Sequence, residues 1–171
     1  MQKNSRQLVL MRHARAEHAG LSDAERRLTE HGRAEAVDAG RWLAAHGFAP
    51  NHALVSSAVR TRETWAGMQS AAGWDLQAEH QRALYTAGTE TALDLIRLLP
   101  DTAPAAIVVG HNPTIAVLAQ LLSDGVGDSA ALAKMSEGYP PGALTVFDLV
   151  GDWLELELMA ATVTAFYVPV G

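Results

Sequence analysis

Cysteine is absent from the sequence, lysine occurs only at Lys3 and Lys134, and apolar runs are short. Without cysteine the chain can form no disulfide, no thiolate nucleophile and no cysteine-based zinc site. No window offers about 18 consecutive apolar residues, which argues against a membrane-spanning helix. The first residues, MQKNSRQLVLMRHAR, lack the apolar stretch of a signal peptide. We therefore expect a cytoplasmic protein with no membrane partner.

The composition is typical of one globular domain, which we expect to span residues 1–171. Hydrophobic residues make up 49% of the chain and charged residues 19%, which is enough apolar material for a core. The net charge of −6 argues against a nucleic-acid partner, because such binding needs a basic surface. The basic residues are mostly arginines, however, and a few converging arginines can still hold a phosphate or a carboxylate.

Short apolar runs alternate with segments of helical periodicity, which predicts an α/β fold. The predicted strands are 7–11, 53–56, 78–84, 105–109, 143–150, 153–158 and 162–168. Gly151 and Asp152 separate two of these runs, as in a hairpin. We expect three layers, in which helices flank a mainly parallel mixed sheet with an antiparallel edge. The segment 125–142 is rich in glycine, serine and proline and is expected to be irregular.

Capping residues predict where the helices begin. The expected N-caps are Thr29, Ser56 or Ser57, Thr89 and Asn112. Pro113 is expected at the first position of its helix, which is a favoured site for proline. Gly47, Gly73 and Pro100 mark the ends of the first three helices.

Arginine and histidine follow three of the predicted strands. They are Arg12 and His13 after the first strand, Arg60 shortly after the second, and His111 after the strand 105–109. Ligands of α/β sheets bind beyond the carboxyl ends of the strands. If these strands are parallel neighbours, the four side chains converge on one crevice.

Such a crevice would bind an anion, because it combines two guanidinium groups with two imidazoles and contains no acid. A tetrahedral phosphoryl group fits it better than a carboxylate, since its oxygens can accept from several donors at once. Phosphoryl transfer depends mainly on positioning and on neutralising oxygen charge, which arginines can supply. Nearby cations would also keep one imidazole neutral, with a lone pair available for nucleophilic attack.

Each of these residues also has a structural interpretation when it is taken alone. A single histidine after a strand is more often a satisfied polar residue than a catalyst, and Arg60 alone would be a solvated residue of a first helical turn. A metal site on His13 and His111 is disfavoured, because neither strand end carries a His-x-His or His-x3-His pattern or an adjacent carboxylate. The functional interpretation depends on the coincidence of three strand ends.

Four motifs occur together over nearly the whole chain. They are LMRHA at 10–14, RRLTEHG at 26–32, SSAVRTRET at 56–64 and VGHNP at 109–113. In type and order they resemble the signature motifs of the histidine phosphatase superfamily, which is also called phosphoglycerate-mutase-like. The short chain and the Gly-His-Asn-Pro form are most similar to the SixA-type phosphohistidine phosphatases.

This resemblance implies a phosphoglycerate-mutase-like fold and a metal-independent phosphatase with no organic cofactor. His13 would attack phosphorus and carry a transient phosphohistidine, which water then hydrolyses. Arg12, Arg60 and His111 would hold the phosphoryl oxygens, and His111 would share the catalytic role. Arg26 would be a fourth phosphate contact, although it also fits a surface arginine before a helix.

One position departs from the pattern of the superfamily. Many members carry an acidic proton donor where this sequence has Ala83. Glu63 and Glu79 are the nearest alternatives, and both also fit solvated surface carboxylates. A positioned acid is worth about 10²–10⁴-fold for a poor leaving group such as an alkoxide. Protonated imidazole leaves more easily, so the missing acid favours phosphohistidine as substrate.

Three functions therefore remain open from the sequence. The leading hypothesis is removal of phosphate from phosphohistidine in a partner protein of the HPt type. The second is the same chemistry on a small phosphorylated metabolite, although the short chain leaves little length for a lid over a small substrate. The third, prompted by Ala83, is a phosphate-binding module without turnover.

Overall fold

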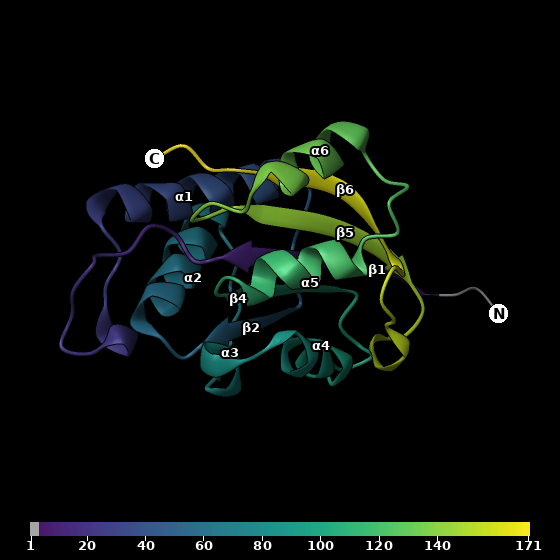
Figure 1. The fold of residues 1–171 in the computed structure, drawn as a ribbon, viewed down its shortest axis with the longest axis horizontal. Coiled ribbons are helices and arrows are strands. Elements are labelled where there is room, and N and C mark those ends of the chain that lie inside the picture. Colours follow the sequence, from purple (N-terminus) through teal and green to yellow (C-terminus); the bar gives the residue numbers. More distant parts are fainter. Residues whose placement is uncertain (1–3) are drawn as a thin grey trace.

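A six-stranded sheet lies at the centre of the computed structural model, which describes residues 4–171 (Figure 1). Its strand order is β3-β2-β4-β1-β5-β6. The strands are β1 (Ser5–Arg12), β2 (His52–Ser56), β3 (Glu79–Gln81), β4 (Ala105–Gly110), β5 (Leu144–Val150) and β6 (Ala161–Tyr167). The pairs among β1, β2, β3 and β4 are parallel, whereas β5 is antiparallel to both β1 and β6. The predicted mainly parallel mixed sheet with an antiparallel edge is confirmed.

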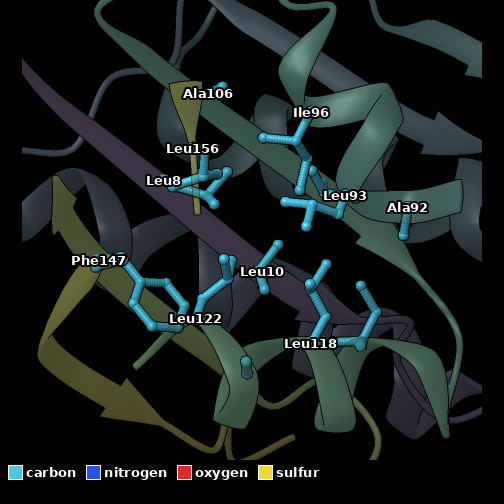
Figure 2. Close-up of a cluster of buried hydrophobic side chains, with 14 of the residues drawn as sticks. Leu8, Leu10, Ala92, Leu93, Ile96, Ala106, Leu118, Leu122, Phe147 and Leu156 are labelled. Atoms are coloured by element: carbon cyan, nitrogen blue, oxygen red, sulfur yellow. The ribbon is translucent and has the colours of Figure 1, made fainter. Parts of the chain in front are cut away.

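Helices cover both faces of this sheet and complete the three layers. They are α1 (Glu30–Ala45), α2 (Val59–Ala72), α3 (Ala83–Thr86), α4 (Thr89–Arg97), α5 (Thr114–Leu122) and α6 (Ser129–Glu137), with short 3-10 helices η1 (Asp23–Glu25) and η2 (Trp153–Glu155). The alternation of β1 explains the two cores, since neighbouring strand residues point to opposite faces. Val9 and Met11 pack in a cluster with α1 and α2, whereas Leu8 and Leu10 pack with α4 and α5. Figure 2 shows the second cluster, in which Leu93 and Leu118 approach Leu10.

One of the predicted helix N-caps is confirmed and the others are wrong. The Thr29 hydroxyl accepts a hydrogen bond from Gly32 N and caps α1, as expected. The cap of α2 is Ala58, because the hydroxyl of Ser56 contacts a histidine instead. The cap of α4 is Gly88, which places Thr89 inside the helix.

The start of α5 also differs from the prediction. Its N-cap is Pro113, which follows a cis peptide bond, so neither Asn112 as cap nor Pro113 as first helical residue is correct. The side chain of Asn112 reaches away from the helix and donates to Tyr139 O at 2.9 Å. A long-range contact therefore replaces the expected local cap.

The predicted strand 153–158 does not form. Residues 153–155 are a 3-10 helix, and the antiparallel partner of β5 is β6. The cause is Trp153, which is fully buried and donates its indole N–H to Ala103 O at 2.8 Å. This contact holds residues 153–155 against the segment that precedes β4, so Gly151 and Asp152 do not form a hairpin turn between two strands.

Two further segments correct the sequence prediction. The supposedly irregular stretch 125–142 contains α6, whose first turn is capped by Asp128 through a 2.8 Å bond from Ala131 N. The weak strand predicted at 78–84 is shortened to β3, and α3 begins at Ala83. Within residues 4–171, we find no helix that combines the length and the apolar character needed to cross a membrane.

Candidate active site

The carboxyl ends of the three predicted strands meet at one edge of the sheet. Arg12 of β1 is paired in register with Gly110 of β4, and Val109 of β4 is paired with Val55 of β2. The backbone ladder extends one step further, because His13 N donates to Gly110 O at 3.0 Å. The side chains that follow these strands are thereby brought together. We call this set of four residues, Arg12, His13, Arg60 and His111, the anion cage.

His13 has the geometry of a neutral nucleophile. Its Nδ1 lies 2.7 Å from the carbonyl oxygen of Ala14, an acceptor, so Nδ1 carries the hydrogen and the lone pair is on Nε2. The pKa of His13 is lowered from 6.5 to about 4, mainly by burial and in addition by the charges of Arg60, Arg12 and Arg26. The imidazole is therefore unprotonated at neutral pH.

His111 faces His13 across the cage, with ring centroids 5.3 Å apart. Arg60 Nη2, which can only donate, lies 3.4 Å from His111 Nδ1. The hydrogen of this imidazole therefore sits on Nε2 and is donated to Ser56 Oγ at 2.7 Å. Burial is the main cause that lowers the pKa of His111 to about 3, followed by the charges of His13 and Arg60.

The two arginines of the cage present hydrogen-bond donors that the protein does not use. Arg12 Nη1 donates to Tyr139 O at 3.0 Å, and Arg60 Nη1 donates to Asp23 O at 2.7 Å. The Nε of each is buried without a hydrogen-bond partner among the described residues. A buried donor without an acceptor is costly, typically by about 1–3 kcal/mol. An oxyanion that reached these Nε–H groups would supply the missing acceptors.

The loop after β1 is held by residues of α1 and α2, two of which belong to the sequence motifs. A Cβ on Gly32 would lie 1.9 Å from Arg15 O, so glycine is required where α1 begins against this loop. The buried carboxylate of Glu35 accepts from Arg15 N at 2.8 Å. The Thr64 hydroxyl accepts from Ala14 N at 3.0 Å, which connects the loop to α2. These contacts fix His13 relative to Arg60.

Arg26 lies at the mouth of the same site. It lines a cavity of about 550 Å³ together with Arg12, His13 and Arg15. Its Nη1 donates to Glu17 O at 3.0 Å, which ties the arginine to the loop between β1 and α1. The structure thus brings Arg26 to the cage, and Arg15 contributes to the rim.

The carboxylates that the sequence offered as proton donors lie elsewhere. Glu63 accepts from Leu28 N at 2.8 Å and is 3.5 Å from Arg27, so it supports a neighbouring loop. Glu79 of β3 pairs with His52 of β2, with 2.9 Å between Glu79 Oε2 and His52 Nε2. Ala83 is exposed at the start of α3 and carries no acid.

Asp23 is the acidic residue of the site, and sequence reasoning missed it. The carboxylate of this η1 residue accepts from Arg60 Nη2 at 3.2 Å and from the Tyr85 hydroxyl. Tyr85 also lies edge-on to His111, with ring centroids 5.6 Å apart. No strand or helix periodicity surrounds Asp23, so its position three residues before Arg26 was the only available signal.

The described residues contain no group of three or more His, Asp or Glu side chains arranged to hold a metal ion. The acidic and imidazole groups of the site are dispersed. Asp23 faces Arg60, Glu35 faces Arg15, and His13 faces His111. The arrangement is suited to binding an anion with arginine donors next to a neutral imidazole.

The fold and these motifs define the class of the protein. The model of the histidine phosphatase superfamily (branch 1) matches residues 8–85, which include Arg12, His13 and Arg60. A protein of Mycobacterium tuberculosis of uncharacterized function is 35% identical over 161 residues, which cover 93% of this chain and 99% of that protein. The chain belongs to the histidine phosphatase superfamily and is a phosphatase.

Solved structures narrow the class to SixA-like proteins. A proposed phosphohistidine phosphatase SixA of Nakamurella multipartitia is 31% identical, with a TM-score of 0.87 and coverage of 100% of both chains. A proposed SixA of Agrobacterium tumefaciens is 28% identical, with a TM-score of 0.79 over 96% of this chain and 98% of that one. The resemblance to SixA-type histidine phosphatases that the four motifs indicated is confirmed.

Proposed function

We propose that this phosphatase removes phosphate from phosphohistidine in a partner protein, in the cytoplasm, through a covalent intermediate on His13. The observation that carries the proposal is the anion cage, in which two buried Nε–H donors lack partners among the described residues beside a neutral imidazole. Two similar proteins of known structure are described as proposed phosphohistidine phosphatases SixA, which supports the choice of substrate.

In the first step, His13 Nε2 attacks phosphorus while Arg12 and Arg60 neutralise the phosphoryl oxygens. The bond between phosphorus and the substrate nitrogen breaks, and its electron pair stays on that nitrogen. The leaving ring keeps the hydrogen on its other nitrogen and departs as neutral imidazole. No proton transfer is needed, so the step proceeds with alanine at position 83.

The second step repeats this chemistry with His13 as the leaving group. Nδ1 of His13 keeps its hydrogen because it donates to Ala14 O at 2.7 Å. Phosphorylated on Nε2, the ring is an imidazolium, and it too leaves as a neutral imidazole. Water adds to phosphorus, the phosphorus–nitrogen bond breaks, and inorganic phosphate and a proton are released. Substrate and intermediate are thus chemically alike.

The remaining residues hold the transferred group. His111 contacts Arg60 and faces His13, so it borders the space that the phosphoryl group would occupy. To donate to a phosphoryl oxygen, the ring would carry its hydrogen on Nδ1, and Nε2 would then accept from the Ser56 hydroxyl. The hydrogen bond between Ser56 Oγ and His111 Nε2 fixes the orientation of the His111 ring. Arg26 lines the cavity at the mouth and would provide a further positive charge for the incoming dianion.

The proposed substrate is tested by offering the protein a phosphorylated HPt-type domain beside phosphorylated sugars, with free phosphate as the readout. We expect rapid loss of phosphate from the HPt domain and slow turnover of the sugars, because an alkoxide needs the acid that position 83 does not supply. Turnover of the sugars alone would assign the enzyme to small phosphorylated metabolites. Tight vanadate binding without turnover of any substrate would show that the protein is a phosphate-binding module.

A further inference from the structure

Asp23 lies beside the anion cage. It belongs to the loop between β1 and α1, which is drawn in purple at the left of Figure 1. Its Oδ2 accepts from Arg60 Nη2 at 3.2 Å and from the Tyr85 hydroxyl, and its Oδ1 accepts from Arg26 Nε at 3.0 Å. The side chain is 56% exposed, so the carboxylate faces both Arg60 and the solvent side of the site. The backbone carbonyl of Asp23 also holds Arg60 Nη1 at 2.7 Å.

These contacts make Asp23 an ionised carboxylate. Both of its oxygens accept hydrogen bonds, and two of the three donors are arginines, which cannot accept a proton in return. The hydrogen bond from Tyr85 is the largest cause that lowers the pKa of Asp23 to about 2, and the charges of Arg60 and Arg26 act in the same direction. Asp23 therefore presents negative charge rather than a transferable proton.

The position of Asp23 determines what it meets when substrate arrives. Arg60 is shared between Asp23 and the cage, so any phosphoryl group held by Arg60 brings its attached group close to the carboxylate. A cationic attached group is attracted and can donate a charge-assisted hydrogen bond. An anionic attached group is repelled, because like charges at short range are unfavourable.

We propose that Asp23 is a specificity-determining residue that makes the anion cage prefer phosphoryl groups carried on a cationic nitrogen, such as the imidazolium of phosphohistidine. This inference rests on the proposed function and adds the residue that selects the substrate. The carboxylate accepts a hydrogen bond from the imidazolium N–H remote from phosphorus. That hydrogen stays on the ring when the phosphorus–nitrogen bond breaks, so Asp23 gains and loses no proton.

The test compares two substrates of the wild type and of Asp23→Asn. In N-phosphoimidazole, assayed near pH 6, the phosphoryl group is attached to a cationic ring, whereas in p-nitrophenyl phosphate it is attached to an aryl group without positive charge. The measured quantity is the ratio of kcat/KM for N-phosphoimidazole to kcat/KM for the aryl phosphate. We expect Asp23→Asn to lower this ratio about 10- to 100-fold, the range expected for one hydrogen bond to a charged group.

The ratio separates selection from positioning of Arg60. A variant that only displaced Arg60 would lose activity on both substrates equally, and an unchanged or increased ratio would overturn the proposal. Glu25→Gln is the matched control, because it removes the same charge from the same 3-10 helix and Glu25 contacts Ser22, away from Arg60. We expect this control to keep the wild-type ratio, and a fall equal to that of Asp23→Asn would also overturn selection by Asp23.

Two further outcomes keep the test decisive. If wild-type protein hydrolyses the aryl phosphate but not N-phosphoimidazole, the proposed phosphohistidine function fails, and the role of Asp23 fails with it. If N-phosphoimidazole is hydrolysed and the ratio is insensitive to Asp23, only the role of Asp23 fails. Should Asp23→Asn lower the melting temperature strongly, Asp23→Ser replaces it with the same expected loss of ratio.

Discussion

Arg6 and Arg60 are both buried arginines, with 2% and 5% exposure, yet they treat their hydrogen-bond donors differently. Arg6 lies near the start of β1, at the end of the strand opposite the cage. Its Nε donates to Gly151 O at 2.7 Å, its Nη1 donates to two backbone carbonyls, and its Nη2 pairs with Asp152 at 3.0 Å. Arg60 leaves its Nε without a partner among the described residues.

This difference separates a structural arginine from one that binds a ligand. Arg6 closes its hydrogen bonds within the fold and links β1 to the segments around Ala103 and Gly151. Arg60 and Arg12 leave donors that only an added acceptor can satisfy. The two ends of β1 therefore serve different purposes, since one end stabilises the fold and the other carries the chemistry.

Replacing His13 with alanine should have the largest effect on activity and a small effect on stability. Without the nucleophile no phosphohistidine can form, and we expect kcat to fall by at least about 10⁴-fold. Initial rates with p-nitrophenyl phosphate measure the loss, and thermal unfolding serves as the control for the fold. Substantial residual activity in a variant with a normal melting temperature would refute His13 as the nucleophile.

Arg60→Ala and Arg6→Ala should separate binding from stability. Loss of Arg60 should weaken vanadate binding about 100-fold, because a charged donor to the oxyanion is removed. Loss of Arg6 leaves the carbonyls of Gly151 and Asp101 without this donor, removes one of the two donors to Ala103 O, and should cost about 3 kcal/mol of unfolding free energy. Vanadate affinity should be unchanged in the folded protein. Both variants are titrated with vanadate and unfolded in urea. If Arg6→Ala weakens vanadate binding as much as Arg60→Ala does, the distinction between a structural and a ligand-binding arginine is wrong.

Sequence predicted the cage because its residues follow strands. Arg12 ends β1, His13 and His111 directly follow β1 and β4, and parallel strands bring their carboxyl ends to the same edge of the sheet. The strand β1, buried on both faces at residues 8–11, was likewise predicted from its short apolar run. The Thr29 N-cap was also predicted correctly, because a cap depends on residues that are neighbours in the sequence.

The features that sequence did not predict depend on contacts between distant segments. Trp153 is buried against Ala103, and this contact prevents the strand predicted at 153–158. Asn112 donates to Tyr139 O instead of capping its own helix. Asp23 reaches Arg60 and Tyr85 from an irregular loop. In each case the decisive partner lies far along the chain, so the pattern around the residue does not identify it.

The histidines of the cage should also make the unfolding free energy depend on pH, whereas Arg6, at the other end of β1, should not. The pKa of His13 is about 4 in the fold, against 6.5 for an unperturbed histidine. Between these two pH values the unfolded chain binds more protons than the folded one, so the unfolding free energy rises with pH in this window. Above the window both states are neutral at this residue, and the contribution vanishes. His111, whose pKa is about 3, acts with the same sign and extends the window toward lower pH.

The measurement is urea denaturation of the wild type and of His13→Ala at several pH values between 4.5 and 7. We expect the wild type to lose stability as the pH falls through this range, and the variant to lose less, because it lacks one buried imidazole whose protonation the fold opposes. Arg6→Ala should shift the whole curve downward without changing its slope. Parallel curves for the wild type and His13→Ala would show that His13 titrates in the fold as it does in the unfolded chain, and would remove the basis for treating it as a neutral nucleophile held by burial.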